Sequence, residues 1–275
     1  MQSSDNPENL VKAFILSAGR GERMRPLTDT LPKPMLRVHG KPLLQWQMEA
    51  VARAGVQEVV VNTAWLGDRI SEYFGSRFAE SLPTSDTTVP TSEQPIRITY
   101  SQEGVDFGGA LETGGGIVRA LPHLTNVFWV LAGDIFVPEF VFSDAAVHRF
   151  VASKKLAHLW LVPNPGHNPG GDFGLAPHNS STSSNAALAI AHCETQFTYS
   201  TIGLFRRELF TPPYCNIPVG NPEGVKAKLA PILRAAMDDA RVTAELYTGN
   251  WTDVGTPERL AMLNNPPIEK SCTRP

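Results

Sequence analysis

The sequence predicts an α/β fold, Rossmann-like, in which a mainly parallel mixed β-sheet is covered by helices on both faces. Short apolar runs of strand length alternate with longer segments of helical composition along the chain. The first run is almost continuously apolar, as buried parallel strands are, and a glycine-containing loop follows it. A chain of 275 residues with 42% hydrophobic content can bury one full core, so we expect a single domain over residues 11–264.

Strand and helix alternate over the first part of this predicted domain. Residues 11–16 and 57–62 have the apolar character of strands. Residues 42–54 have the composition of a helix, with a proline tolerated in its first turn and Gly55 suited to the cap that follows. A second helix is expected over residues 66–79. The order strand, helix, strand favours a parallel sheet.

The same alternation continues in the middle of the chain. We expect a strand over residues 96–100, a loop over 101–110, a helix from Thr113 to about residue 121 and a strand over 127–132. Thr113 is a suitable N-cap residue, and the glycines that follow it are also compatible with a ligand-binding turn.

The last part of the predicted domain contains mainly helices. Helices are expected over residues 143–153, 225–240 and 257–263, and a strand over 157–162. Additional strands on both sides of residues 178–185 are expected to build a second lobe.

Four polar segments lie outside these elements. They lack apolar periodicity, and the two internal ones are rich in small polar residues. We expect a flexible leader, two exposed insertions and a tail over residues 1–10, near 80–95, near 178–185 and over 265–275.

A basic loop after the first strand is the strongest functional signal in the chain. Gly19 and Gly21 allow the backbone to approach a ligand, while Arg23 and Lys33 supply a planar fork and a compact ammonium for phosphate oxygens. A dinucleotide-binding turn needs a third glycine where Met24 stands, and no Walker sequence occurs in the chain. The loop therefore predicts another kind of polyphosphate site, and an ordinary basic surface loop is the alternative.

Charge and composition exclude several classes of protein. The net charge is −3 and the sequence pI is near 6.2, so there is no overall attraction to nucleic acid or to an anionic membrane. No apolar run reaches the ~18 residues that cross a bilayer. Cys193, Cys215 and Cys272 lack metal-binding or redox spacing. We expect a cytoplasmic protein that binds neither nucleic acid nor membrane.

At these residues the sequence resembles the sugar-1-phosphate nucleotidyltransferases. Their signature, Gly-x-Gly-x-Arg followed by Pro-Leu-Thr and Pro-Lys-Pro, stands here at residues 19–23, 26–28 and 32–34. The likeness covers most of the chain and includes residues 59–62, 112–116, 133–134 and 251–256. The motifs at residues 62–67, 111–116 and 171–173 look most like those of the members that act on N-acetylmuramate 1-phosphate.

The resemblance implies a three-layer, glycosyltransferase-A-like fold and a Mg²⁺-dependent reaction of UTP with a sugar 1-phosphate, in peptidoglycan recycling. Asp134 and Asp253 each follow an apolar segment, and the resemblance makes them the expected Mg²⁺ ligands. A turn or a helix cap is the alternative for an aspartate at such a position. Among the catalytic residues, Arg23 is expected to bind the β- and γ-phosphates and Lys33 the α-phosphate.

The resemblance also implies a set of binding residues. The expected nucleotide-binding residues are Ala18, Gly19, Arg20, Gly21, Glu22, Arg23, Lys33, Glu112, Thr113 and Gly114. Asp172 is expected to bind sugar hydroxyls, and Lys228 either reaches the sugar phosphate or is a surface lysine. Ala132 departs from the polar residue that related sequences often carry before Gly-Asp.

Two alternatives remain open at this point. The chain is another sugar-1-phosphate nucleotidyltransferase, such as a guanylyltransferase for mannose or heptose 1-phosphate or an enzyme of the glucose 1-phosphate type. The second alternative is a non-catalytic regulator that binds sugar nucleotides.

Overall fold

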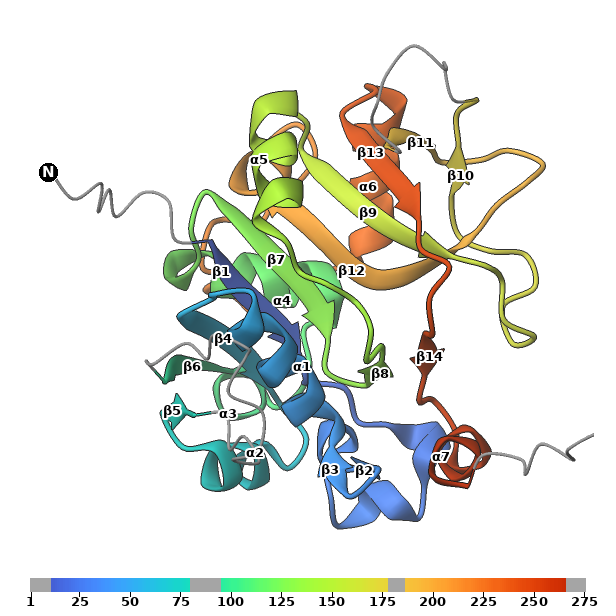
Figure 1. Cartoon of the computed structure of the whole chain (residues 1–275). Coiled ribbons are helices and arrows are strands. Elements are labelled where there is room, and N and C mark those ends of the chain that lie inside the picture. Colours follow the sequence, from blue (N-terminus) through green and yellow to red (C-terminus); the bar gives the residue numbers. More distant parts are fainter. Residues whose placement is uncertain (1–10, 80–94, 178–185, 266–275) are drawn as a thin grey trace, which may run out of the picture.

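A ten-stranded mixed sheet forms the centre of the protein (Figure 1). The structure, a computed structural model, describes residues 11–79, 95–177 and 186–265. The predicted leader, insertions and tail lie outside these residues, apart from residues 95 and 265. In spatial order the strands are β10 (Gly174–Leu175), β11 (Ala187–Ile190), β13 (Val242–Leu246), β9 (Ala157–Val162), β12 (Thr198–Arg206), β7 (Val127–Ala132), β1 (Lys12–Leu16), β4 (Glu58–Thr63), β6 (Ile96–Gln102) and β5 (Arg77–Phe78).

The strands β7, β1, β4 and β6 are parallel and form the half of the sheet that positions the site. Leu16 at the end of β1 pairs with Asn62 of β4 on one side and with Ala132 of β7 on the other. The carboxyl ends of these strands therefore meet at one edge of the sheet, which is where open α/β sheets bind their ligands.

The other half of the sheet is largely antiparallel. Strand β12 runs antiparallel to both β7 and β9, whereas β13 is parallel to β9. The strands β11 and β10 extend this half by antiparallel pairing. The expected α/β architecture is confirmed, and the sheet is mixed, as predicted.

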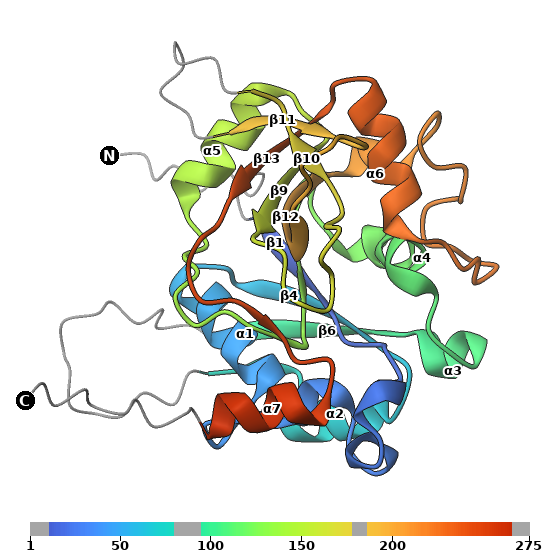
Figure 2. The ribbon, with the colours of Figure 1, turned by 90° about the vertical axis from the view of Figure 1, so that its right-hand side faces the viewer.

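Helices cover both faces of the sheet and make three layers (Figures 1 and 2). One face carries α1 (Leu43–Arg53), α2 (Gly67–Phe74) and α5 (Asp144–Ser153), whose apolar side chains share a core cluster with the sheet. The opposite face carries α4 (Glu112–Ala120) and α6 (Leu229–Asp238), which pack on the sheet through a second cluster.

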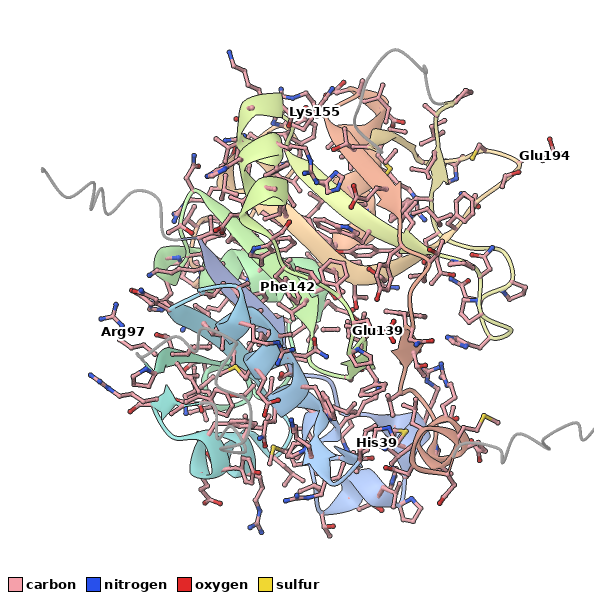
Figure 3. All side chains as sticks on the ribbon, in the orientation of Figure 1. His39, Arg97, Glu139, Phe142, Lys155 and Glu194 are labelled. Atoms are coloured by element: carbon pink, nitrogen blue, oxygen red, sulfur yellow. The ribbon has the colours of Figure 1, made fainter. Side chains whose placement is uncertain are left out.

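Aromatic side chains fill the layer beneath α5. Phe142, labelled in Figure 3, meets the Trp129 ring edge-on with ring centroids 5.0 Å apart. Trp129 also lies against Trp160, at 5.2 Å between centroids. Both tryptophans are buried, so this cluster removes a large apolar area from water where β7 and β9 are bridged by β12.

A small lobe extends from the carboxyl edge of the sheet. It contains β8 (Ile135–Phe136) paired with β14 (Thr252–Asp253), and a hairpin of β2 (Arg37–Val38) and β3 (Lys41–Pro42). His39 lies in the hairpin turn with φ 52°, near α7 (Pro257–Asn264), as Figure 3 shows. The lobe has its own core of six buried residues: Met24, Leu36, Val38, Leu43, Phe136 and Val254.

Four predicted elements are wrong in their extent. The helix expected over residues 66–79 ends at Phe74, because Gly75 turns with φ 63° and residues 77–78 form β5. The loop expected over residues 101–110 contains the end of β6 and a short helix, α3 (Glu103–Phe107). Helix α4 begins at Glu112, so Thr113 is not its N-cap.

The helix expected over residues 225–240 starts only at Leu229. The Gly115 N–H donates to the Ala227 carbonyl (3.0 Å), and the Ala227 N–H donates to the Leu111 carbonyl (3.1 Å). These backbone groups are used against the first turn of α4 and are not available for helical hydrogen bonds. The competing pairing is between segments more than a hundred residues apart, so local periodicity could not indicate it.

No helix in the part of the chain that the structure describes is both long and apolar enough to span a membrane.

Candidate active site

The basic loop leaves β1 at the carboxyl edge of the sheet and is anchored from below. The Ser17 N–H donates to Asn62 Oδ1 (2.7 Å), and Gly21 adopts φ 68°, a conformation that favours glycine. Met24 is fully buried in the core of the small lobe. The residue that excluded a dinucleotide-binding turn is therefore the hydrophobic anchor of this loop.

Two arginines of this loop, Arg20 and Arg23, have different surroundings. Arg20 donates to the Thr28 carbonyl (2.8 Å) and to Asp29 Oδ1 (3.0 Å), and its guanidinium stacks on Trp65 at 3.9 Å. The hydrogen bond from Arg20 lowers the pKa of Asp29. Arg23 is exposed and makes no hydrogen bond or ion pair with the residues that the structure describes. Arg20 thus stabilises the loop, and Arg23 presents a free guanidinium to solvent.

The two predicted carboxylates converge, although 119 positions separate them in the sequence. Strand β14 places Asp253 opposite Ile135, and the Val254 N–H donates to the Asp134 carbonyl (3.1 Å). The Lys33 ammonium hydrogen-bonds to Asp134 Oδ2 and lies 3.9 Å from Asp253 Oδ1.

In this triad of Lys33, Asp134 and Asp253, Lys33 is only 8% exposed, whereas the two aspartate side chains are 29% and 24% exposed. Two carboxylates that share one cation offer oxygen donors of the kind that Mg²⁺ prefers. Within the described residues, no group of three or more His, Cys, Asp or Glu is arranged to hold a metal. A pair suits Mg²⁺, which commonly takes one or two protein carboxylates and completes its shell with water and phosphate oxygens.

Two further residues surround Asp253 that the sequence reasoning did not identify. Arg259 of α7 donates to Asp253 Oδ2 (2.9 Å), and His167 Nε2 lies 3.3 Å from the same oxygen. Asp253 therefore has basic groups on both of its oxygens. The only sequence signal for Arg259 was its position six residues after Asp253. This spacing does not indicate a contact until β14 and α7 are folded against each other.

A cavity of about 450 Å³ opens beside the start of the basic loop and Asp134. It brings together six of the predicted site residues: Ala18, Gly19, Arg20, Glu112, Thr113 and Asp134. Its wall also includes Asn62, Glu103 and Thr201, to which the sequence analysis gave no role. Six of the predicted catalytic and nucleotide-binding residues do not line it: Gly21, Glu22, Arg23, Lys33, Gly114 and Asp253.

The glycines at the start of α4 explain why Gly114 is set back from this cavity. A Cβ at Gly114 would lie 2.9 Å from the Ala227 carbonyl oxygen, and one at Gly115 would lie 2.5 Å from that of Val225. These glycines therefore permit close packing of the segment before α6. Glu112, which adopts φ 61°, and Thr113 are left to face the cavity.

A second cavity, of about 350 Å³, adjoins the first and shares four lining residues with it: Leu16, Glu112, Thr113 and Thr201. Both predicted substrate-binding residues, Asp172 and Lys228, line it. Asp172 Oδ2 accepts hydrogen bonds from the Tyr199 N–H (2.8 Å) and from Asn168 Nδ2 (3.2 Å), which fixes the carboxylate. Lys228 is exposed at the N-terminus of α6.

Two polar atoms of this second cavity's lining residues are buried without a hydrogen-bond partner among the described residues. They are Tyr199 Oη and Arg234 Nε. Burial raises the pKa of Tyr199, so the hydroxyl stays protonated. Buried polar groups are normally satisfied, so these two atoms are exceptions in the wall of this cavity.

A third hollow, of about 440 Å³, lies at the opposite end of the strands and includes none of the predicted site residues. Val11 and Val127, at the amino ends of β1 and β7, line it. Because ligands of open α/β sheets bind at the carboxyl ends of the strands, the two adjoining cavities are the candidate active site.

Comparison with known proteins gives a family match over most of the chain. Residues 12–267 match the family model described as Nucleotidyl transferase. The N-acetylmuramate alpha-1-phosphate uridylyltransferase of Neisseria meningitidis serogroup B is 41% identical over 251 residues, which are 91% of this chain and 95% of that protein. The protein of the same name from Caulobacter vibrioides is 38% identical over 148 residues, 54% of this chain and 52% of that protein.

The fold is also similar to that of a solved structure. The UTP-bound UGPase from Acinetobacter baumannii superposes with a TM-score of 0.67 over 92% of each chain, at 15% sequence identity. This similarity confirms the predicted class of fold.

Proposed function

Because this chain belongs to the nucleotidyl transferase family, we propose that it joins UTP and N-acetylmuramate 1-phosphate to give UDP-N-acetylmuramate and pyrophosphate. The observation that carries the proposal is the pair of adjoining cavities. One is lined by the start of the basic loop and by Asp134, and the other has two unsatisfied buried polar atoms among its lining residues. The first suits a nucleoside triphosphate and the second suits the sugar.

The reaction is an in-line exchange at phosphorus. A phosphate oxygen of the sugar 1-phosphate attacks the α-phosphorus of UTP, a new P–O bond forms, and the bond to the pyrophosphate oxygen breaks. Both reactants are anions, so catalysis depends on positioning and on neutralising charge. We assign Lys33 to the α-phosphate, because its ammonium is held in place by Asp134, and the free guanidinium of Arg23 to the β- and γ-phosphates.

We propose that Asp134 and Asp253 hold a Mg²⁺ ion. The two carboxylates converge on one cation in the structure, and their oxygen donors match the ligands that Mg²⁺ takes from proteins. When bound, Mg²⁺ neutralises phosphate charge as it develops. The chain's own contribution is to fix Asp253 Oδ2 through Arg259, which leaves Oδ1 directed at Lys33.

The residues of the second cavity favour an acidic sugar as the substrate. N-acetylmuramate carries a lactyl carboxylate that N-acetylglucosamine lacks, and the guanidinium of Arg234 has an unsatisfied buried Nε at this cavity. A carboxylate that accepts from Arg234 would satisfy this donor, and Lys228 adds positive charge at the rim. Asp172 remains the proposed partner of a sugar hydroxyl.

Pyrophosphate release tests the proposal. The protein is mixed with Mg²⁺, each nucleoside triphosphate in turn, and the 1-phosphates of N-acetylmuramate, N-acetylglucosamine, glucose, mannose and heptose. We expect the highest kcat/KM with UTP and N-acetylmuramate 1-phosphate. The best rate with GTP and mannose or heptose 1-phosphate would instead show a guanylyltransferase, and no release with any pair would show a non-catalytic regulator.

A substitution in the second cavity tests the choice of sugar. Arg234→Gln is expected to reduce the preference for N-acetylmuramate 1-phosphate over N-acetylglucosamine 1-phosphate by about tenfold or more. The reason is that the proposed contact between the guanidinium and the lactyl carboxylate is lost. Arg69→Gln, at an exposed position on α2, is the matched control. An unchanged ratio of the two kcat/KM values in Arg234→Gln would contradict the assignment.

The proposed reaction also places the protein. UTP and sugar 1-phosphates are cytoplasmic metabolites, so we propose a cytoplasmic enzyme of peptidoglycan recycling, with one nucleotidyltransferase domain over residues 11–264.

A further inference from the structure

A buried glutamate connects the segments that surround the nucleotide cavity. Glu103 is 0% exposed and stands at the start of α3, in the cavity wall. Its Oε1 accepts a hydrogen bond from Asn62 Nδ2 (2.7 Å), and its Oε2 accepts one from the Leu111 N–H (2.8 Å). The same carboxylate therefore contacts the end of β4 and the residue that precedes α4.

Asn62 extends this connection to the basic loop. Its Oδ1 accepts the hydrogen bond of the Ser17 N–H at 2.7 Å. Ser17 and Asn62 are each 2% exposed, so the whole chain of hydrogen bonds is shielded from water. The chain links the start of the basic loop, the end of β4 and the first turn of α4 across the floor of one cavity.

The two backbone N–H groups at the ends of this chain of hydrogen bonds fix the direction of every hydrogen bond in it. Ser17 N–H and Leu111 N–H can only donate, so Asn62 must turn its oxygen to Ser17 and its amide nitrogen to Glu103. Position 103 must then accept on both of its terminal atoms. A carboxylate does this, whereas a glutamine has one donor and creates a donor–donor conflict in either orientation.

Burial works against an acidic group at this position. Burial raises the pKa of Glu103, so keeping this carboxylate ionised at neutral pH opposes folding. Its nearest cation, Arg119, directs its own hydrogen bonds to Asp106 Oδ2 (2.7 Å) and to the Gly220 carbonyl (3.0 Å). Gly116 makes room for the carboxylate, because a Cβ there would lie 2.7 Å from Glu103 Oε1.

We propose that Glu103 is a positioning residue that sets the separation between the basic loop, where the phosphates bind, and the first turn of α4, where the nucleoside binds. Glu112 and Thr113 follow directly after Leu111 and line both cavities, so a shift of Leu111 moves them against the basic loop. The inference rests on the proposed function only in requiring that a nucleotide occupies this cavity.

Single and double substitutions test the hydrogen-bond chain. Glu103→Gln and Asn62→Asp each break its donor–acceptor pattern, the first by a donor–donor conflict and the second by opposing two carboxylates. Each is expected to weaken UTP binding to the folded protein by about tenfold or more, the scale of one unsatisfied buried group. UTP affinity is measured by calorimetry in the presence of Mg²⁺, and the melting temperature is recorded for each variant.

The double variant Asn62→Asp with Glu103→Gln restores the pattern. The new carboxylate at position 62 accepts from the Ser17 N–H and from the new amide at position 103, whose oxygen accepts from the Leu111 N–H. We expect UTP affinity to return to within about threefold of wild type, as coupled neighbouring sites allow. If Glu103 only stabilised the fold, its substitution would lower the melting temperature, but UTP affinity would not fall in the single variants and recover in the double variant.

Glu49→Gln is the matched control, because Glu49 is also a buried carboxylate but accepts its hydrogen bonds from Gln45 (2.9 Å) and Lys41, outside the cavity. Its UTP affinity should equal that of wild type. Wild-type affinity in Glu103→Gln, or a double variant no better than the single ones, would overturn the inference. Failure of the wild-type protein to bind any nucleoside triphosphate would instead overturn the proposed function.

Discussion

Replacing Asp253 with asparagine tests the carboxylate pair most directly. Asp253 Oδ1 lies 3.9 Å from Lys33 Nζ, and Oδ2 accepts a hydrogen bond from Arg259 at 2.9 Å. The substitution keeps the size of the side chain and removes its charge, so the basic groups around it lose their common partner. We expect turnover to fall by at least ~100-fold, as on removal of a key electrostatic stabiliser.

The distances support a loss of this size. A unit charge 3.9 Å from another interacts by about 4 kcal/mol at an effective dielectric constant of 20, which suits a site near the protein surface. A hundredfold loss of turnover corresponds to ~2.7 kcal/mol, so part of one such interaction is sufficient. The side chain of Asp253 is 24% exposed, and this exposure is the reason for expecting less than the full value.

The assay is pyrophosphate release at saturating UTP and N-acetylmuramate 1-phosphate, repeated over a range of Mg²⁺ concentrations. We expect a lower kcat and a higher Mg²⁺ requirement, with a melting temperature that shows a folded protein. Asp68→Asn, an exposed aspartate in the first turn of α2, is the control and should retain wild-type turnover. Wild-type turnover in Asp253→Asn would refute the role of the carboxylate pair.

Three other predictions concern the basic loop, the glycines of α4 and the stability of the sheet. Arg23→Ala should raise the KM for UTP at least about tenfold without changing the melting temperature, because this exposed arginine has no described partner; a normal KM would contradict its phosphate role. Gly115→Ala should lower the free energy of unfolding by ~1–3 kcal/mol in urea denaturation, since its Cβ would meet the Val225 carbonyl oxygen at 2.5 Å, and unchanged stability would disprove the close packing. The His158 ring, whose Nε2 lies 3.7 Å from Glu245 Oε2, is the main cause of the lowered pKa of Glu245, so the ionised form of Glu245 stabilises the fold above its ordinary pKa of 4.5. This stability is lost as the pH falls through the lowered value, and Glu245→Gln should flatten that acid-side fall in urea titrations.

Much of the parallel half of the fold was predictable because each signal is local. The strands β1, β4 and β7 are short apolar runs buried from both sides, and their ends lie within two residues of the predicted ones. Helices α1 and α5 were predicted for the same reason, with turn and cap residues close to their ends. The errors fall where distant segments compete with local preference, as at residues 225–228, whose backbone pairs with the start of α4.

The candidate site divides in the same way. The sequence pointed to the basic loop and to Asp134, because glycines, cations and an aspartate after a strand follow each other within short stretches of chain, and the family resemblance added Asp253. It placed both Arg20 and Arg23 at the nucleotide, whereas in the structure Arg20 holds the loop through Asp29 and Trp65 and Arg23 makes no such contact. That distinction depends on which neighbours the fold brings to each guanidinium.

By itself, the sequence determined the kind of chemistry and the class of fold. Both depend on residue types at short spacings, because backbone conformation and local charge are set by residues close together in the chain. Only the tertiary structure decided that Arg259 and His167 flank Asp253, and that Glu103 ties Asn62 to Leu111. Such contacts join residues that are far apart in the chain or separated by loops. Their partners are selected by the packing of the whole sheet, and no local pattern in the sequence carries that information.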